Sequence, residues 1–295
     1  MNMIVDCNQP LITVYVPTHN RRDLLERALR SILEQTYENL DVIIVDDGSS
    51  DSTREFMEQA VQKYDQVSYF RHDSPKGACA ARNLALSKAR GEFVTGLDDD
   101  DEFLPNHIEG LYRSFKGNYS FVAACLLEDN GTIRIERRLD CGEIGLDSLL
   151  HYNKVGNQVF TKTNYMLEIG GFDVEFPAFQ DYDTWVRLVD RFGPGLKVEQ
   201  ATYVWHTSHE KDRISNFPHK RLNALSMFID KHQSLMSKNH HDSLAVMRIR
   251  MAGEPFPFRA LLKRLNRGNW KASVALFLNS NFSRLKTIID NYRHS

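Results

Sequence analysis

The sequence predicts an α/β fold with a mostly parallel central sheet flanked by helices, followed by a helical C-terminal extension. Short apolar, β-branched runs alternate with segments whose apolar residues recur at helical spacing, and polar motifs follow directly after the predicted strands. The 295-residue chain is long enough for one large domain with an appendage. Its 42% hydrophobic and 26% charged residues are typical of a globular protein, which argues against disorder.

The first half of the chain contains four predicted strands, each a short apolar run. They cover residues 11–16 (ending at Pro17), 41–47, 67–71 and 92–97. Three helical segments lie between them, beginning at residues 22, 53 and 77. Asp51 or Ser52 is placed to cap the second, Gly77 opens the third, and Pro105 suits the first turn of a further helix.

The second half has a less regular pattern. Asn130 and Gly131 join two strand-like runs and predict a β-hairpin. QDYDTWVRLVDRF reads as a helix, with Trp185 on its apolar side, and KVEQATYVWH reads as a strand. Three helical segments follow Asn216, the last being LKTIIDNY. We therefore expect a domain over residues 1–214 and a basic helical region over 215–295.

Charge is distributed unevenly along the chain. From Arg213 to Ser295 there are 15 Lys and Arg against 4 Asp and Glu, out of totals of 37 and 39, so residues 1–212 hold 22 against 35. A basic tail attracts phosphate-bearing partners. Its aromatic residues could sit at a membrane surface, while a structural cap or a homodimer interface is the alternative. The aromatic residues concerned are Phe256, Phe258, Trp270 and Phe277.

The N-terminus lacks a basic stretch followed by an apolar run, and no window is apolar enough for a membrane span. The four cysteines show no metal-ligand spacing, which favours free thiols in a reducing compartment. We expect a cytoplasmic protein, attached to a membrane at most at its surface, on the inner face.

Three polar motifs follow predicted strands: Pro17 to Asn20, Asp46 to Gly48, and the acidic cluster Asp98 to Asp101. In parallel sheets, ligands bind beyond the carboxyl ends of the strands, so the motifs should converge on one crevice. Four adjacent carboxylates repel one another unless a cation such as Mg²⁺ or Mn²⁺ neutralises them. In an extended segment Asp98 and Asp100 would point together. The alternative is a solvated acidic loop.

Other candidates have a functional and a structural interpretation. Asp47 could bind a base or ribose, or could belong to a capping turn. Lys76 and Arg82 suit a diphosphate but could be surface charges. From the residues alone, Asp181 is better explained as a helix N-terminal carboxylate than as a general base. His206 and His209 are metal or phosphate ligands, or polar loop residues, and the residues favour the latter.

Together these motifs resemble family 2 glycosyltransferases, which have the GT-A fold, from about Leu11 to Ser215. The resemblance rests on five motifs in order: VPTHNR, VDDGSSD, GACAARNLAL, LDDDDEFLP and FQDYDTWVRL. It departs at Gln180, where the family often has Glu before the base, which puts an acceptor contact in doubt. The loop that contains His209 fits the family only loosely.

The resemblance implies an inverting transfer of a sugar from a nucleotide-sugar donor, UDP-linked by analogy, to a hydroxyl of a glycan or lipid-diphosphate-linked acceptor in bacterial surface polysaccharide synthesis. Asp181 would be the catalytic base, and Asp100 would bind Mn²⁺ or Mg²⁺, with Asp98 and His209 as further metal candidates. The implied donor-binding residues are Pro17, Thr18, Asn20, Asp47, Lys76, Arg82, Asp98 and Asp99.

Two other functions compete with this one. A sugar nucleotidyltransferase should have a glycine-rich loop after the first strand, where this chain has PTHNRRD. A catalytically degenerate donor-binding scaffold would not need both Asp100 and Asp181. We expect no nucleic-acid partner, although salt-dependent DNA binding by the tail would revive that possibility.

Overall fold

The computed structural model of the protein describes residues 9–207 and 218–282. The described chain divides into two compact units. The first comprises residues 9–146, 154–175 and 180–207, and the second comprises 147–153, 176–179 and 218–282. Two short segments from the middle of the chain therefore belong to the second unit together with the C-terminal helices.

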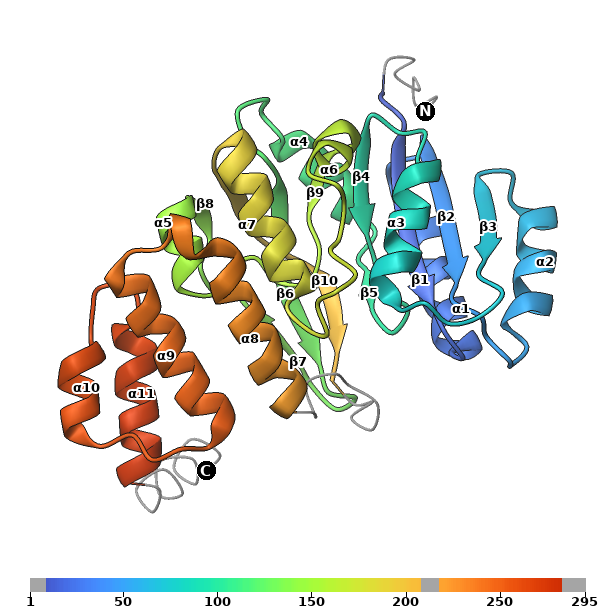
Figure 1. Cartoon of the computed structure of the whole chain (residues 1–295). Helices are drawn as coiled ribbons and strands as arrows, with labels where there is room; N and C mark the ends of the chain where they lie inside the picture. Colours follow the sequence, from blue (N-terminus) through green and yellow to red (C-terminus); the bar gives the residue numbers. More distant parts are fainter. Residues whose placement is uncertain (1–8, 208–217, 283–295) are drawn as a thin grey trace. The chain divides into compact units, whose positions relative to one another are not determined.

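The first unit is built on a ten-stranded mixed sheet (Figure 1). The strand order is β3-β2-β1-β4-β9-β6-β10-β5, with β7 added on β6 and β8 on β10. The strands are β1 (Ile12–Thr18), β2 (Leu40–Asp46), β3 (Val67–Arg71), β4 (Phe93–Gly96), β5 (Glu102–Phe103), β6 (Val122–Asp129), β7 (Arg134–Arg137), β8 (Gly142–Ile144), β9 (Phe160–Lys162) and β10 (Gly195–His206).

The sheet is parallel from β3 to β4, and β6 also pairs in parallel with β10. β1, β2 and β4 are buried along their whole length, as parallel strands covered on both faces must be. The register places Thr18 of β1 opposite Asp46 of β2, so both strands deliver their polar motifs at the same edge. The predicted α/β class is confirmed, with antiparallel additions at β5, β7, β8 and β9.

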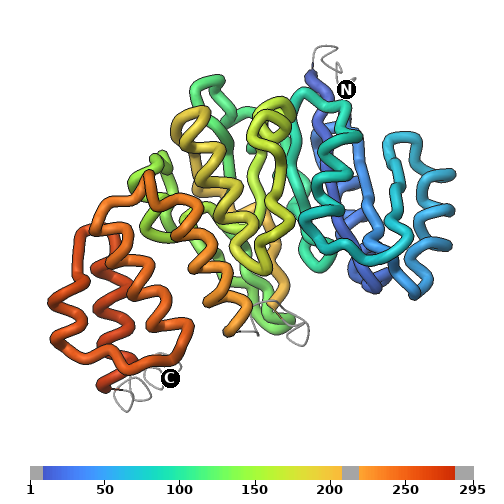
Figure 2. Tube along the Cα trace, viewed as in Figure 1, coloured from blue at the N-terminus to red at the C-terminus, as the bar shows by residue number. Residues whose placement is uncertain are grey.

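Helices cover both faces of this sheet, and Figure 2 follows the strand–helix alternation from blue to teal. Apolar residues of three of these helices, including Leu25, Met57 and Ile108, form one core with Val14 and Ile44 of the strands. The helices of the first unit are α1 (Arg22–Leu33), α2 (Thr53–Lys63), α3 (Ala78–Lys88), α4 (His107–Ser114), α6 (Thr163–Glu168) and α7 (Gln180–Phe192).

Two predicted boundaries are wrong by a few residues. β1 continues through Pro17 to Thr18, because its pairing with β4 ends at Tyr15 and Pro17 then borders only β2. Pro105 precedes α4, whose N-cap is Asn106, so it lies before the first turn and not in it. The hairpin is confirmed: β6 and β7 pair antiparallel across a turn in which Gly131 has φ +85°.

The second unit is helical among the described residues. Val246, Ile249, Phe256 and Leu261 form its core. The predicted helix LKTIIDNY lies outside the described residues, and no helix within them is long and apolar enough to cross a membrane. The helices of the second unit are α5 (Leu146–His151), α8 (Pro218–His232), the 3-10 helix η3 (Gln233–Leu235), α9 (Lys238–Ala252), α10 (Phe258–Arg264) and α11 (Trp270–Asn281).

Candidate active site

The three strand-end motifs meet at one edge of the sheet in the first unit. The Asp47 backbone N–H donates to the Thr18 carbonyl at 2.8 Å, and Thr18 Oγ1 donates to Asp99 Oδ2 at 2.8 Å. Asn20, with φ +54°, accepts a hydrogen bond from the Ser50 N–H at 2.7 Å. The predicted convergence of these segments is therefore confirmed, although their roles toward a substrate remain predictions.

The acidic cluster forms a tight turn, because the Asp101 N–H donates to the Asp98 carbonyl at 3.0 Å. The expectation of an extended segment with Asp98 and Asp100 side by side is wrong here. Asp98 Oδ1 accepts from Arg82 and from Gln158, each at 2.9 Å. Asp101 is buried and accepts from the Tyr203 hydroxyl at 2.9 Å, and burial raises its pKa well above the usual value. Asp101 is thus part of the scaffold that shapes the turn.

Arg21 is a cation at the acidic turn that the sequence did not predict. Its Nη1 lies 3.0 Å from Asp99 Oδ1 and 3.3 Å from Asp100 Oδ2. Burial raises the pKa of Asp99 to about 6, against the opposing effects of Arg21 and Thr18. The only sequence signal was the position of Arg21 in PTHNRRD, since its partners lie more than seventy residues away.

Asp47 organises the loop that opens α3. Its Oδ1 accepts from His72 Nδ1 and the Lys76 N–H, and its Oδ2 accepts from the Gly77 N–H, all within 2.8 Å. Burial alone would raise the pKa of Asp47, but these bonds hold it below its usual value. Gly48, at φ +74°, packs against the same loop, where a Cβ would approach the Pro75 nitrogen to 2.9 Å.

Lys76 and Arg82 differ in how they are held. The Lys76 side chain is exposed at the loop, whereas Arg82 is buried, donates to Asp98 at 2.9 Å and lies 5.4 Å from the centre of the Phe172 ring. Burial opposes the charge of Arg82, yet Asp98 and other neighbours raise its pKa above the usual value. The Arg82 Nε is buried with no hydrogen-bond partner among the described residues. An orphaned buried donor beside the acidic turn is a group that an anionic ligand would satisfy.

Two carboxylates in the first turn of α7 have different environments. Asp183 is fully buried and forms an ion pair with Arg187 at 2.8 Å. The Arg187 guanidinium also donates to the carbonyls of Ile169 and Gly171. Asp181 is partly exposed, and burial raises its pKa to about 6, with Asp98 adding to the effect and Arg82 opposing it. Asp181 is therefore within electrostatic reach of the acidic turn.

The buried side-chain amide of Gln158 is hydrogen-bonded to the acidic turn. Gln158 accepts from the Tyr15 hydroxyl at 3.0 Å and donates to Asp98, and it lines a pocket with Thr95, His107 and Tyr203 whose empty space, open solvent included, is about 280 Å³. A Cβ on Gly96 would lie 2.2 Å from Gln158 Oε1, so only glycine leaves room for this arrangement.

The histidines of the terminal loop separate into two cases. His206 ends β10, where its Nε2 lies 2.6 Å from Glu102 Oε1 and its N–H donates to Asp101. It is a buried residue within the strand, so the favoured prediction of a polar loop residue is wrong in its placement. His209, the further metal candidate, lies outside the described residues.

A mostly parallel α/β sheet with an acidic turn beyond a strand end, a buried arginine on α3 and a partly buried carboxylate on α7 has the features of a GT-A glycosyltransferase. Residues 13–176, more than half of the chain, match the model of glycosyl transferase family 2. The chain therefore belongs to this family of enzymes.

Two relatives agree with this assignment. The chain is 33% identical over 274 residues, 90% of this chain and 96% of the other, to the Escherichia coli (strain K12) protein named as the colanic acid biosynthesis glycosyl transferase WcaA. It is 39% identical over 129 residues to the Campylobacter jejuni GalNAc(5)-diNAcBac-PP-undecaprenol beta-1,3-glucosyltransferase, covering 43% of this chain and 42% of that one.

The fold is also similar to that of the mannosyltransferase PcManGT from Pyrobaculum calidifontis, solved in complex with GDP-Man and Mn²⁺. The TM-score is 0.63 at 18% sequence identity, over 97% of this chain and 85% of that one. This likeness concerns the fold alone.

Proposed function

We propose that the protein is an inverting glycosyltransferase that moves a sugar from a nucleotide-sugar donor to an acceptor hydroxyl in bacterial surface polysaccharide synthesis. The observation that carries the proposal is that Arg82 bonds Asp98 at 2.9 Å and that the charges of both residues act on Asp181. Arg82 offers an orphaned, buried Nε donor, and Asp181 has a pKa raised to about 6. One group suits a departing diphosphate, and the other suits a general base near neutral pH.

The donor would lie along the three strand ends. Thr18, Asn20 and Pro17 face the nucleotide at the end of β1, Asp47 contacts the base, and Asp99 contacts the ribose. In such a complex, Asp47 and Asp99 would add these contacts to bonds that they already make within the protein.

Arg82 would bind the diphosphate through its Nε, with Lys76 as an exposed second cation. Both residues belong to the segment that opens α3, and Arg82 already bonds Asp98. Positive charge in this place stabilises the leaving group, whose negative charge grows as the sugar departs.

The carboxylates of the acidic turn fit a hard divalent cation such as Mn²⁺ or Mg²⁺. Asp100 would hold it, with help from Asp98. The Asp100 carboxylate is partly exposed and pairs with Arg21 at 3.3 Å, a contact that a cation could replace. The cation would offset the negative charge of the departing diphosphate. Asp181 takes the proton from the acceptor oxygen, which attacks the anomeric carbon from the face opposite the leaving group and so inverts its configuration.

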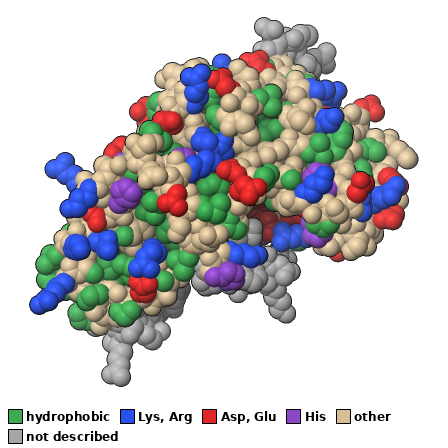
Figure 3. Space-filling view, in the orientation of Figure 1, with side chains coloured by type: hydrophobic (Ala, Val, Ile, Leu, Met, Phe, Trp, Pro, Cys, Tyr) green, Lys and Arg blue, Asp and Glu red, His purple; other side chains and the backbone are tan. Residues whose placement is uncertain are grey.

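A surface of the second unit suits a lipid-linked acceptor at the inner face of a membrane. Trp270, Val274 and Leu278 recur every four residues on α11 and are exposed, Trp270 by 53%, instead of joining the core. Figure 3 shows apolar side chains among Lys and Arg over these helices. The exposed large apolar residues of α10, α11 and the residue that follows each helix, called the apolar patch below, are Phe258, Leu262, Leu265, Trp270, Val274, Leu278 and Phe282.

Residues 255–282 contain no acidic side chain, and four exposed cations lie in the same segment as the patch: Arg259, Lys263, Arg267 and Lys271. Exposed apolar side chains in a basic segment match anionic lipid. Two of the four aromatic residues expected at this surface lie elsewhere, because Phe256 is fully buried and Phe277 packs against the core of the second unit.

Flotation with vesicles of anionic lipid tests the membrane contact. The protein should float at low salt, and Trp270→Ser with Leu278→Ser should abolish flotation, while Leu167→Ser, an exposed apolar control in the first unit, should not. Failure of the unaltered protein to float at low salt would remove the membrane contact. Concentration-dependent dimerisation lost in the same double variant would assign the patch to a second copy of the chain instead.

A panel of UDP- and GDP-sugars, incubated with the protein and Mn²⁺, Mg²⁺ or a chelator, tests the reaction. We expect release of nucleoside diphosphate from one or two donors only, and loss of release with the chelator. Release of pyrophosphate from a nucleoside triphosphate and sugar phosphate would favour a nucleotidyltransferase, and donor binding without release would favour a degenerate scaffold.

A further inference from the structure

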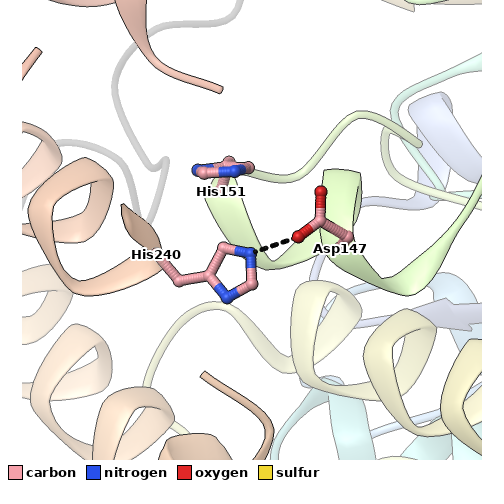
Figure 4. Close-up of side chains that lie close together, drawn as sticks. All are labelled: Asp147, His151 and His240. Atoms are coloured by element: carbon pink, nitrogen blue, oxygen red, sulfur yellow. Dashed lines mark hydrogen bonds and ion pairs between the residues drawn. The ribbon is translucent and has the colours of Figure 1, made fainter. Parts of the chain in front are cut away.

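The second unit contains a compact group of two imidazoles and one carboxylate: Asp147 and His151 from α5, and His240 from α9. One nitrogen or oxygen from each lies within 4.8 Å of the others. Figure 4 shows the three side chains converging from the two helices. Over residues 9–207 and 218–282, no other group of three His, Cys, Asp or Glu side chains meets this spacing.

The local structure brings these groups together from distant parts of the sequence. Asp147 and His151 are four residues apart on α5 and so share one face of the helix. The two histidines are buried, and their rings meet edge to face at 4.5 Å, whereas the Asp147 side chain is 89% exposed. The group is thus buried on the imidazole side and open to solvent on the carboxylate side.

Hydrogen bonding fixes the tautomer of His151. The Ser243 hydroxyl donates its hydrogen to the Asn239 carbonyl at 2.9 Å. Ser243 Oγ therefore accepts in its 2.7 Å hydrogen bond with His151, and the imidazole donates through Nδ1–H. With its proton on Nδ1, the ring presents the Nε2 lone pair. A metal-binding histidine is held in this way, with its other nitrogen donating to a fixed oxygen. Gly268 packs against the ring, where a Cβ would come within 2.2 Å of Nε2.

His240 makes two hydrogen bonds, one as an acceptor and one as a donor. Its Nδ1 accepts from the Ser237 N–H at 3.0 Å, and its Nε2–H donates to Asp147 Oδ1 at 3.0 Å. A cation at Nε2 would take the place of that hydrogen, which moves to Nδ1. The Ser237 N–H then loses its acceptor on His240, and the exposed position of Ser237 lets water replace it. Binding therefore requires one tautomer change and the loss of both hydrogen bonds of His240, and no net release of a proton.

We propose that Asp147, His151 and His240 bind a divalent transition-metal ion of the kind that prefers imidazole, such as Zn²⁺. Two imidazoles with one carboxylate are a common ligand set for such ions, and the exposure of Asp147 leaves room for water as a further ligand. The ion links α5 to α9 within the second unit. This site is separate in sequence and in ligand chemistry from the all-carboxylate turn of the active site.

Calorimetric titration of the chelator-treated full chain with Zn²⁺ tests the site, with excess Mg²⁺ present to occupy oxygen ligands. The unaltered protein should bind one more Zn²⁺ than His240→Gln. Asp147→Asn should weaken this binding at least tenfold, and His241→Gln, an exposed neighbour on α9, should bind as the unaltered protein does.

Thermal unfolding gives a second readout: Zn²⁺ should raise the Tm of the unaltered protein and of His241→Gln, but not of His240→Gln. Equal Zn²⁺ stoichiometry and affinity in the unaltered protein and Asp147→Asn would overturn the proposal, as would the absence of binding. If His240→Gln does not fold, Asp147→Asn carries the test, because its exposed side chain tolerates substitution.

Discussion

The pKa of Asp181 gives the reaction a pH dependence that can be worked out in advance. Burial raises this pKa from 3.8 to about 6. The ionised carboxylate is the base, so activity is present above the raised pKa and is lost as the pH falls through it. With a pKa of about 6, roughly nine tenths of Asp181 is ionised at pH 7 and roughly one tenth at pH 5. Turnover should therefore fall about tenfold between these values.

The assay is the rate of nucleotide release at saturating donor across this range. Saturation matters because burial also raises the pKa of Asp99 to about 6, and protonation of Asp99 would weaken donor binding instead of turnover. Donor affinity measured at each pH separates the two effects. A turnover rate unchanged from pH 7 to pH 5 would refute the reasoning, because a carboxyl of ordinary pKa stays mostly ionised over that interval.

Three substitutions test other contacts. Gly96→Ala places a Cβ against Gln158 and should lower the free energy of unfolding by about 1–3 kcal/mol in a urea titration; unchanged stability would contradict the close approach. Arg82→Lys keeps the charge but loses the Nε donor and should slow nucleotide release by about 100–1,000-fold, since a donor aimed at developing charge is worth this much. Asp183→Asn leaves Arg187 without its buried partner and should cost about 3 kcal/mol of stability, whereas full stability with lost activity would contradict a structural role.

Much of the first unit could be predicted from the sequence, because its strands are continuous apolar runs. β2 and β3 lie where their apolar residues predict, and their polar ends meet as parallel strands require. The two-residue and three-residue strands β5 and β9 carry too few residues for a pattern. The membership of residues 147–153 in the second unit depends on tertiary contacts that no local pattern reports.

The site was predicted unevenly for similar reasons. The acidic cluster and Asp47 are visible because they follow strands, but the pairing of Arg21 with Asp99 joins residues 78 positions apart. Local reasoning about Asp181 favoured a helix N-terminal carboxylate, and the structure does place it in the first turn of α7. Its proposed role as a base comes from the family resemblance, to which the structure adds its surroundings and raised pKa.

Asp181→Asn tests the central claim most directly, with Asp190→Asn, an exposed carboxylate on the same helix, as its control. Donor affinity and the rate of nucleotide release are measured on both variants. If Asp181 is the base, its amide variant binds the donor with unchanged affinity and loses at least a hundredfold in rate, in the range that general base catalysis contributes, while Asp190→Asn behaves as the unaltered protein. A near-normal rate for Asp181→Asn would contradict the proposed mechanism.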